Sequence, residues 1–247
     1  MNTLAIIARY NEDINWVKQL EIPYLIVNKG DPITDPDLIP YIIEMENSVN
    51  GREAHTYLWY IIEHYESLPD KLIFLQGNPF DHQPQIIRLL SPVSVSDMPD
   101  FLPLTLQYND NVPPRPIKRR YIKRYYNILI YTGHFGENLH DVKPNWVDGG
   151  LIHWLLPLLN TYFDIIYPNT DISLREKIYK LLELPYTKDT LTEFFYGAMF
   201  HVKKELILKR PKEYYIRLKE LCESDIMLPY ILERMWLELF RTDPIVQ

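Results

Sequence analysis

The chain has 247 residues, of which 47% are hydrophobic and 24% are charged, and its formal net charge is −7. This composition is typical of a globular protein with a full core, and the negative charge argues against general attraction to nucleic acid or anionic lipid. The single cysteine, Cys222, excludes an intramolecular disulfide and a cysteine-rich zinc site. Apolar runs are shorter than the roughly 18 to 20 residues of a membrane span, and no basic segment precedes the first one. We therefore expect a cytoplasmic protein without a transmembrane segment.

The first 90 residues predict the opening of a doubly wound α/β sheet. Short apolar runs at residues 3–8 and 24–28 are typical of buried strands, and residues 14–20 between them predict a helix. A loop with several prolines extends to residue 49. Residues 51–65 then show helical periodicity, and residues 71–75 predict a third strand.

The rest of the chain alternates between helices, strands and one long irregular stretch. Residues 91–116 are rich in Pro, Ser and Asp and predict a surface excursion with a short edge strand at 104–108. No linker divides the chain, so we expect one domain over residues 1–247. The remaining predictions are helices at 85–90, 151–163, 174–182, 204–208, 211–222 and 228–240, and strands at 164–167 and 195–202.

Polar residues follow the first predicted strand directly. Tyr10 could stack on a nucleotide base, while Asn11, Glu12 or Asp13 hydrogen-bonds the edge of that base. The alternative is structural: Asn11 or Asp13 caps the next helix, and the acids of its first turn complement the helix dipole.

The segment Asn50-Gly51-Arg52-Glu53 opens the long helix of the first half. Backbone amides at the start of a helix favour anions, and an arginine can bind a phosphate with two hydrogen bonds. Arg52 is therefore a candidate phosphate ligand. In the alternative, the segment is a turn and Arg52 is solvated.

A second polar segment, residues 76–82, follows the third predicted strand. Gln76 and Asn78 could hydrogen-bond sugar hydroxyls, and Asp81 and His82 could contact the sugar or hold a metal ion. A divalent ion needs three or four ligands, so one Asp-His pair is weak evidence for a metal. Further ligands could come from His134, His140, Asp141 and His153. The alternative is a proline turn in which Asp81 acts as a cap.

Residues 118–126 form the one strongly basic run of the sequence, with tyrosines interleaved. Such a run could bind single-stranded nucleic acid or neutralise a diphosphate leaving group, or it could be a solvated face. The net acidity of the chain disfavours nucleic acid.

Three acids are candidates for a base that removes a proton from an acceptor hydroxyl. Glu137 and Asp148 lie in a polar, turn-rich stretch, and Glu233 lies on the last predicted helix beside Arg234. The alternative for Glu233 and Arg234 is an ordinary surface ion pair.

Taken together, these segments resemble a glycosyltransferase of the GT-A type, with its mixed, mainly parallel, Rossmann-like sheet flanked by helices. The segments at residues 8–13, 51–58 and 68–70 resemble an uncharacterised domain family. The segment Met199-Phe200-His201-Val202-Lys203-Lys204-Glu205 and the later Glu233-Arg234 resemble capsular-polysaccharide glycosyltransferases. The resemblance covers about two thirds of the chain and leaves out residues 91–116.

The resemblance implies a nucleotide-sugar donor bound by residues 1–90 and a glycan or glycolipid acceptor bound by residues 117–247. It implies donor contacts from ten residues and a catalytic role for Asp148 or Glu233. Where such enzymes keep a metal-binding Asp-x-Asp, this chain has Gln76-Gly77-Asn78. Either Asp81 and His82 hold Mn²⁺ or Mg²⁺ instead, or cations such as Arg52, Lys118, Arg119, Arg120 and Arg234 make a metal unnecessary. The implied donor contacts are Tyr10, Asn11, Glu12, Asp13, Arg52, Gln76, Asn78, Asp81, His82 and Arg234.

Overall fold

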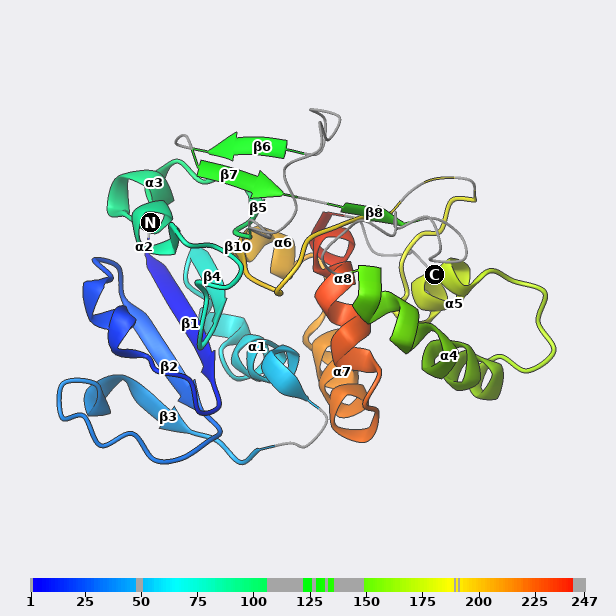
Figure 1. The fold of residues 1–247 in the computed structure, drawn as a ribbon, viewed down its shortest axis with the longest axis horizontal. Helices are drawn as coiled ribbons and strands as arrows, with labels where there is room; N and C mark the ends of the chain where they lie inside the picture. The colour runs from blue at the N-terminus through cyan, green and yellow to red at the C-terminus, as the bar shows by residue number, and fades with distance from the viewer. Residues whose placement is uncertain are drawn as a thin grey trace.

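A computed structural model describes residues 2–47, 51–105, 122–125, 128–131, 133–135, 149–188, 190 and 192–241. Of these, the residues between 122 and 156 are described by their backbone alone. Its centre is a six-stranded sheet in the order β3-β2-β1-β4-β10-β5 (Figure 1). β3, β2, β1 and β4 are parallel, and β10 is antiparallel to both of its neighbours. The strands of this sheet are β1 (Thr3–Arg9), β2 (Tyr24–Asn28), β3 (Ile42–Glu44), β4 (Lys71–Gln76), β5 (Phe101–Pro103) and β10 (Phe200–Lys203). The predicted α/β class, with a mainly parallel Rossmann-like sheet flanked by helices, is confirmed.

Helices and two small hairpins surround this sheet. β6 (Ile122–Tyr125) pairs with β7 (Ile128–Tyr131), and β8 (Gly133–Phe135) pairs with β9 (Thr192–Phe194). Three 3₁₀ helices are η1 (Asn15–Gln19), η2 (Ile39–Tyr41) and η3 (Tyr65–Ser67). The α-helices are α1 (Arg52–Glu63), α2 (Ile86–Leu89), α3 (Pro92–Ser96), α4 (Gly149–Ile166), α5 (Leu174–Leu181), α6 (Lys204–Ile207), α7 (Lys212–Ser224) and α8 (Leu228–Arg241).

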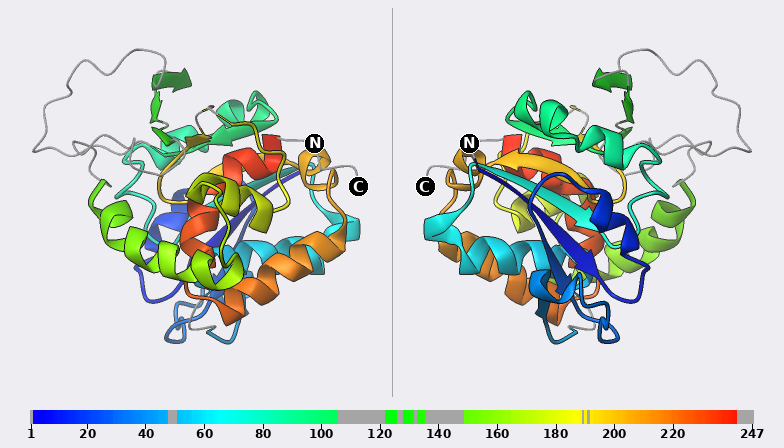
Figure 2. Two further views of the ribbon diagram at one scale, coloured as in Figure 1. Left: turned by 90° about the vertical axis from the view of Figure 1, so that its right-hand side faces the viewer. Right: turned by 90° about the vertical axis from the view of Figure 1, so that its left-hand side faces the viewer.

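Side chains alternate across the sheet and build a core on each face. In β4, Leu72 and Phe74 point to the face covered by α1, α7 and α8, while Ile73 and Leu75 point to the face covered by η1, α2 and α3. This alternation follows from the two-residue repeat of a strand. Figure 2 shows α4 and α5 outside α1, α7 and α8, as a further layer on that face.

Aromatic rings fill the first core where β10 meets α1 and α8. The ring of Phe200 lies 5.1 Å from that of Phe74 and 5.4 Å from that of Trp236, measured between centroids. The ring of Tyr57 of α1 lies 4.7 Å from that of Phe74, tilted by 42°. The last helix and β10 are therefore joined to the N-terminal half through one packed cluster.

Several predicted elements differ from the structure. Residues 164–167 do not form a strand, because α4 continues to Ile166 and the rings of Phe163 and Tyr167 stack one helical turn apart, at 6.2 Å. The predicted strand at 195–202 begins only at Phe200. Gly197 and Ala198 have φ angles of 70° and 48° and form a turn before it.

Two short strands escaped prediction. The loop before residue 49 contains β3, an edge strand of only three residues. The other edge strand, β5, ends at Pro103, before the predicted start at residue 104. Such short edge strands have little apolar periodicity to reveal them. In the part of the chain that the structure describes, no helix combines the length and hydropathy of a membrane span.

Candidate functional site

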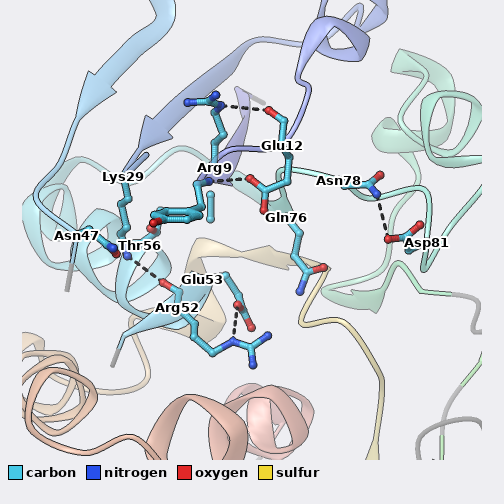
Figure 3. A pocket seen from close by; sticks show the side chains of 12 residues that line it. Arg9, Glu12, Lys29, Asn47, Arg52, Glu53, Thr56, Gln76, Asn78 and Asp81 are labelled. Carbon is cyan, nitrogen blue, oxygen red and sulfur yellow. Dashed lines mark hydrogen bonds and ion pairs between the residues drawn. The ribbon is translucent and has the colours of Figure 1, made fainter. Parts of the chain in front are cut away.

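A cavity of about 490 Å³ lies where the carboxyl ends of β1, β2 and β4 meet the start of α1 (Figure 3). Ligands of open α/β sheets bind at this edge, because the loops that follow parallel strands converge there. The cavity has room for a small organic ligand. Its lining residues are Ala8, Arg9, Tyr10, Glu12, Lys29, Asn47, Arg52, Glu53, Thr56, Gln76, Asn78 and Asp81.

Arg9 ties the ends of β1 and β2 together. Its Nη1 donates hydrogen bonds to Asn28 Oδ1 at 2.5 Å and to the carbonyl oxygen of Asp31 at 2.6 Å. Its Nε donates to the carbonyl oxygen of Glu12 at 3.1 Å. The Glu12 carboxylate in turn accepts a bond from the backbone N–H of Tyr10 at 2.7 Å. This network fixes the loop after β1 and the adjacent wall of the cavity.

The loop after β4 approaches Glu12 closely at Gly77. A Cβ atom at Gly77 would lie 2.5 Å from Glu12 Oε2, which is too close for any other residue without a shift. The carbonyl oxygen of Gly77 also accepts a hydrogen bond from Trp16 Nε1 at 2.8 Å. Close packing against Glu12 therefore favours glycine at position 77 of the Gln-Gly-Asn segment. Gln76 and Asn78, on either side of it, line the cavity.

Two positively charged side chains of the cavity, and one hydroxyl without a partner among the described residues, lie near the start of α1. No side chain caps the helix at Gly51. Arg52 has a φ angle of 44°, and its guanidinium lies over the Tyr230 ring, 4.6 Å from the ring centroid. Lys29 Nζ donates a hydrogen bond of 2.8 Å to the carbonyl oxygen of Arg52. Thr56 is fully buried and lines the cavity, and its hydroxyl has no hydrogen-bond partner among the described residues.

Burial shifts the protonation of two charged groups at this end of the cavity. Burial lowers the pKa of Lys29 to about 8, although the nearby Glu53 carboxylate opposes that shift. Burial also raises the pKa of Glu53; Arg52, with Nε 3.5 Å from Glu53 Oε2, opposes the rise, and Glu233 adds to it. A bound anion would favour the charged form of Lys29.

Asp81 and His82 point to different surroundings. Asp81 lines the cavity and accepts a hydrogen bond from Asn78 Nδ2 at 3.0 Å. The His82 ring instead packs against the turn at Gly197, where an added Cβ atom would lie 2.5 Å from its Cδ2. Burial lowers the pKa of His82, with the Glu233 and Asp81 charges opposing the shift.

Glu233 and Arg234 of α8 hold the same turn from the other side. Glu233 Oε1 accepts a hydrogen bond from the backbone N–H of Gly197 at 3.1 Å, and Glu233 Oε2 lies 3.3 Å from Arg234 Nη1. The described residues that line the cavity include neither of them. Both carboxylate oxygens of Glu233 therefore have partners, one of them in the Gly197 turn.

The structure brings six of the predicted site residues together around the cavity: Tyr10, Glu12, Arg52, Gln76, Asn78 and Asp81. Asn11 and Asp13 have local roles instead. Asn11 Oδ1 accepts from the N–H of Asp31 at 2.8 Å, and Asp13 Oδ1 accepts from the N–H of Asn15 at 2.9 Å, while the N-cap of η1 is Ile14, without a side-chain cap. His82, Glu233 and Arg234 lie at the Gly197 turn. Asp148, Glu137, His140, Asp141, Lys118, Arg119 and Arg120 lie outside the described residues.

Sequence reasoning missed several residues that line the cavity, namely Arg9, Lys29, Asn47, Glu53 and Thr56. A signal for two of them was present. Arg9 and Lys29 stand at or directly after the carboxyl ends of predicted strands, which is the position already used to select Tyr10 and Gln76. Thr56 lies inside the helix, one turn after its start, where only the folded structure relates it to the strand ends.

The side chains of the cavity do not fit a resident divalent metal ion. Within the described residues, no group of three or more His, Cys, Asp and Glu side chains is arranged to hold one. Asp81 is paired with Asn78, and His82 is turned to Gly197. A divalent site needs three or more such ligands, so Asp81 and His82 alone do not make one.

Comparison with known proteins gives one match. Residues 4–94 are similar to the model of a family described as a protein of unknown function (DUF3431). Comparison with curated proteins and with solved structures gives no significant match. The matched segment contains β1 to β4 and α1, and it therefore includes every lining residue of the cavity.

Proposed function

We propose that this protein is a glycosyltransferase that binds a nucleotide-sugar donor in the cavity and transfers the sugar to a glycan or lipid-linked acceptor. The observation that carries the proposal is the position of Lys29, Arg52 and the start of α1 beside three strand ends of a Rossmann-like sheet. Positive side chains beside a helix start at such a place favour a phosphate-containing ligand.

The donor is divided along the cavity in this proposal. Tyr10, whose side chain is largely exposed, stacks on the base, and Glu12 lies beside it. The diphosphate binds at the start of α1, where Lys29, Arg52 and Thr56 line the cavity. Gln76, Asn78 and Asp81 contact the sugar. Figure 3 shows Lys29 and Asp81 at opposite sides of the cavity, which supports separate positions for the diphosphate and the sugar.

The chemistry follows from these positions. An oxygen of the acceptor forms a bond to the anomeric carbon, and the bond from that carbon to the diphosphate oxygen breaks. The acceptor proton passes to a carboxylate, for which Asp148 and Glu233 remain the predicted candidates. Lys29 and Arg52 stabilise the negative charge that develops on the departing nucleoside diphosphate. No step of this scheme depends on a metal ion.

A second candidate is a non-catalytic module that binds a nucleotide or carbohydrate on the same fold. The specific observation in its favour is the geometry of Glu233. Its two carboxylate oxygens already serve the Gly197 turn and Arg234, which leaves it poorly placed to accept a substrate proton. Incubation with nucleotide sugars, with and without Mn²⁺, separates the candidates: binding without release of nucleoside diphosphate supports the module.

Both candidate functions share the premise that the cavity binds a nucleoside diphosphate. Binding of nucleoside diphosphates, screened by thermal shift and measured by calorimetry, tests this premise. For Arg52→Ala we expect affinity about tenfold lower, because a charge-assisted contact to phosphate is lost. Arg88→Ala, at an exposed arginine of α2 away from the cavity, is the matched control. If Arg52→Ala binds as tightly as the control, the diphosphate does not lie at the start of α1.

A further inference from the structure

Arg52, at the edge of the cavity, has contacts with three elements of the fold. Its backbone carbonyl oxygen accepts the hydrogen bond of 2.8 Å from Lys29 Nζ, which follows β2. Its Nε lies 3.5 Å from Glu53 Oε2 of α1, and Figure 3 shows the guanidinium beside that carboxylate. The third contact comes from α8, because Arg52 Cζ lies 4.6 Å from the centroid of the Tyr230 ring. The first contact fixes the backbone of Arg52, and the other two restrict the guanidinium itself.

Tyr230 is the one of these partners that lies far from the cavity segment in the sequence. The segment similar to the uncharacterised family ends at residue 94 and contains every lining residue of the cavity, whereas Tyr230 belongs to α8. That helix has a fixed position, because Leu232, Met235 and Trp236 are fully buried in the same core as the apolar face of α1. The ring beside Arg52 therefore has a rigid support.

The ring contact restricts Arg52 without using its hydrogen-bonding capacity. The Arg52 side chain is 42% exposed, so without such a contact it would have many rotamers to lose when a ligand binds. Ordering one long side chain on binding weakens affinity by about threefold to tenfold. A cation over an aromatic face is attracted by the ring, and this attraction does not require an N–H donor. The N–H groups of a guanidinium held in this way stay available to an anion.

We propose that Tyr230 is a positioning residue, whose ring holds the Arg52 guanidinium in place for a phosphate group before the ligand binds. The inference rests on the proposed function, because it concerns the same phosphate site. It adds that the site is completed by α8, outside the segment that carries the lining residues. Tyr230 does not touch the ligand in this proposal and acts through Arg52 alone.

Removal of the ring tests this role, with inorganic pyrophosphate as the probe and calorimetry on the full chain. We expect Tyr230→Leu to weaken pyrophosphate binding by about threefold to tenfold, because the guanidinium is no longer ordered beforehand. Tyr230→Phe keeps the ring and should bind within about twofold of the wild type.

Tyr186→Leu is the matched control. The Tyr186 ring lies beside Arg175 in a similar way, with 4.7 Å from the guanidinium carbon to the ring centroid, and the described residues that line the cavity include neither of them. Equal affinities in Tyr230→Leu and Tyr186→Leu would overturn the inference.

A double-mutant cycle distinguishes positioning from a general effect on the fold. If Tyr230 acts through Arg52, Tyr230→Leu should change pyrophosphate affinity by less than about twofold when Arg52 is already alanine. The same loss with and without Arg52 would show that the ring only supports the fold, and the inference would be wrong. Chemical denaturation checks that each variant is folded. Tyr230→Met, which fills more of the space without a ring, replaces Tyr230→Leu if the leucine variant does not fold.

This inference and the proposed function fail in distinguishable ways. If the wild type binds pyrophosphate and loss of the Tyr230 ring has no effect beyond the control, only the inference about Tyr230 is wrong. If the wild type binds neither pyrophosphate nor nucleoside diphosphates, the proposed function is wrong at its first step and the inference is wrong with it.

Discussion

Lys29 Nζ, at the end of β2, donates a hydrogen bond of 2.8 Å to the backbone carbonyl of Arg52, the first residue of α1. The φ angle of Arg52 is 44°, in the left-handed region that non-glycine residues adopt at a cost. The bond therefore holds a strained helix start against the neighbouring strand. Both residues line the same cavity.

Replacing Lys29 tests this relationship directly. We expect Lys29→Met to lower the affinity for nucleoside diphosphates by about tenfold or more, because a charge at the phosphate and the anchor of Arg52 are lost together. Lys18→Met is the control, since Lys18 pairs with Asp35 and Asp37 on the surface. Calorimetry with both variants measures the difference. Equal affinities in the two variants would remove Lys29 from the site.

The pH dependence of pyrophosphate binding tests the protonation of Lys29. Because burial lowers the pKa of Lys29 to about 8, this side chain loses its charge between pH 7 and pH 9. The affinity for pyrophosphate should therefore fall over that range in the wild type and stay higher in Lys29→Arg, whose side chain keeps its charge. Because pyrophosphate ionises in the same way in both experiments, the difference between the two profiles reports on Lys29. Parallel pH profiles would contradict the prediction.

The same shift has a consequence for stability. The folded state binds fewer protons than the unfolded state between pH 8 and the ordinary pKa of 10.5. The contribution of Lys29 to the free energy of unfolding should therefore rise with pH across this window. Chemical denaturation of the wild type and Lys29→Met at pH 8 and pH 10 measures this contribution. The free energy of unfolding of the wild type, relative to that of Lys29→Met, should be higher at pH 10 than at pH 8.

Acid sensitivity should come partly from His201 of β10. Its side chain is fully buried, and burial, with the charges of Lys71 and Lys203, lowers its pKa to about 3. The unfolded chain takes up this proton near pH 6.5, so the stabilisation is complete above that value and is lost as pH falls toward 3, by at most about 1.4 kcal/mol per pH unit. We expect His201→Leu to lose less stability than the wild type between pH 6.5 and pH 4 in urea denaturation. His64→Leu is the control, and identical slopes in all three proteins would argue against the effect.

Gly197→Ala tests the turn that Glu233 and His82 hold. The φ angle of 70° and a Cβ atom 2.5 Å from His82 Cδ2 both oppose the substitution, and we expect a loss of about 1 to 3 kcal/mol in the free energy of unfolding. His82→Ala in the same chain should recover the part due to the clash but not the part due to φ. A double-mutant cycle by chemical denaturation separates the two contributions. Strict additivity would show that His82 does not limit the turn.

The sequence predicts the parallel part of the sheet well because its strands are short, continuous apolar runs. Residues 71–75 are buried on both faces, and their apolar run 72–75 predicts a strand from hydrophobicity alone. The predicted element boundaries are wrong where backbone conformation, rather than hydrophobicity, sets the end of an element. At Gly197 and Ala198 two residues with left-handed φ angles interrupt an apolar run, and no side-chain pattern indicates them.

The candidate site was predictable to the extent that it follows strand ends. Tyr10, Gln76 and Asn78 were found by this rule, and Arg9 and Lys29 satisfy it equally well. Glu53 and Thr56 could not be found in this way. Their places in the cavity depend on how α1 packs against the strand ends, a contact between separate segments of the chain, which local patterns do not specify.

The antiparallel strand β10 closes the sheet beside β4, although it comes from residues 200–203. The segment similar to the uncharacterised family ends at residue 94, before this strand. Excised on its own, it would leave the apolar edge of β4 unpaired, with Leu72, Ile73 and Phe74 open to pairing with other chains. The stretch that carries the cavity therefore depends on residues 200–203, far along the chain, to complete its sheet.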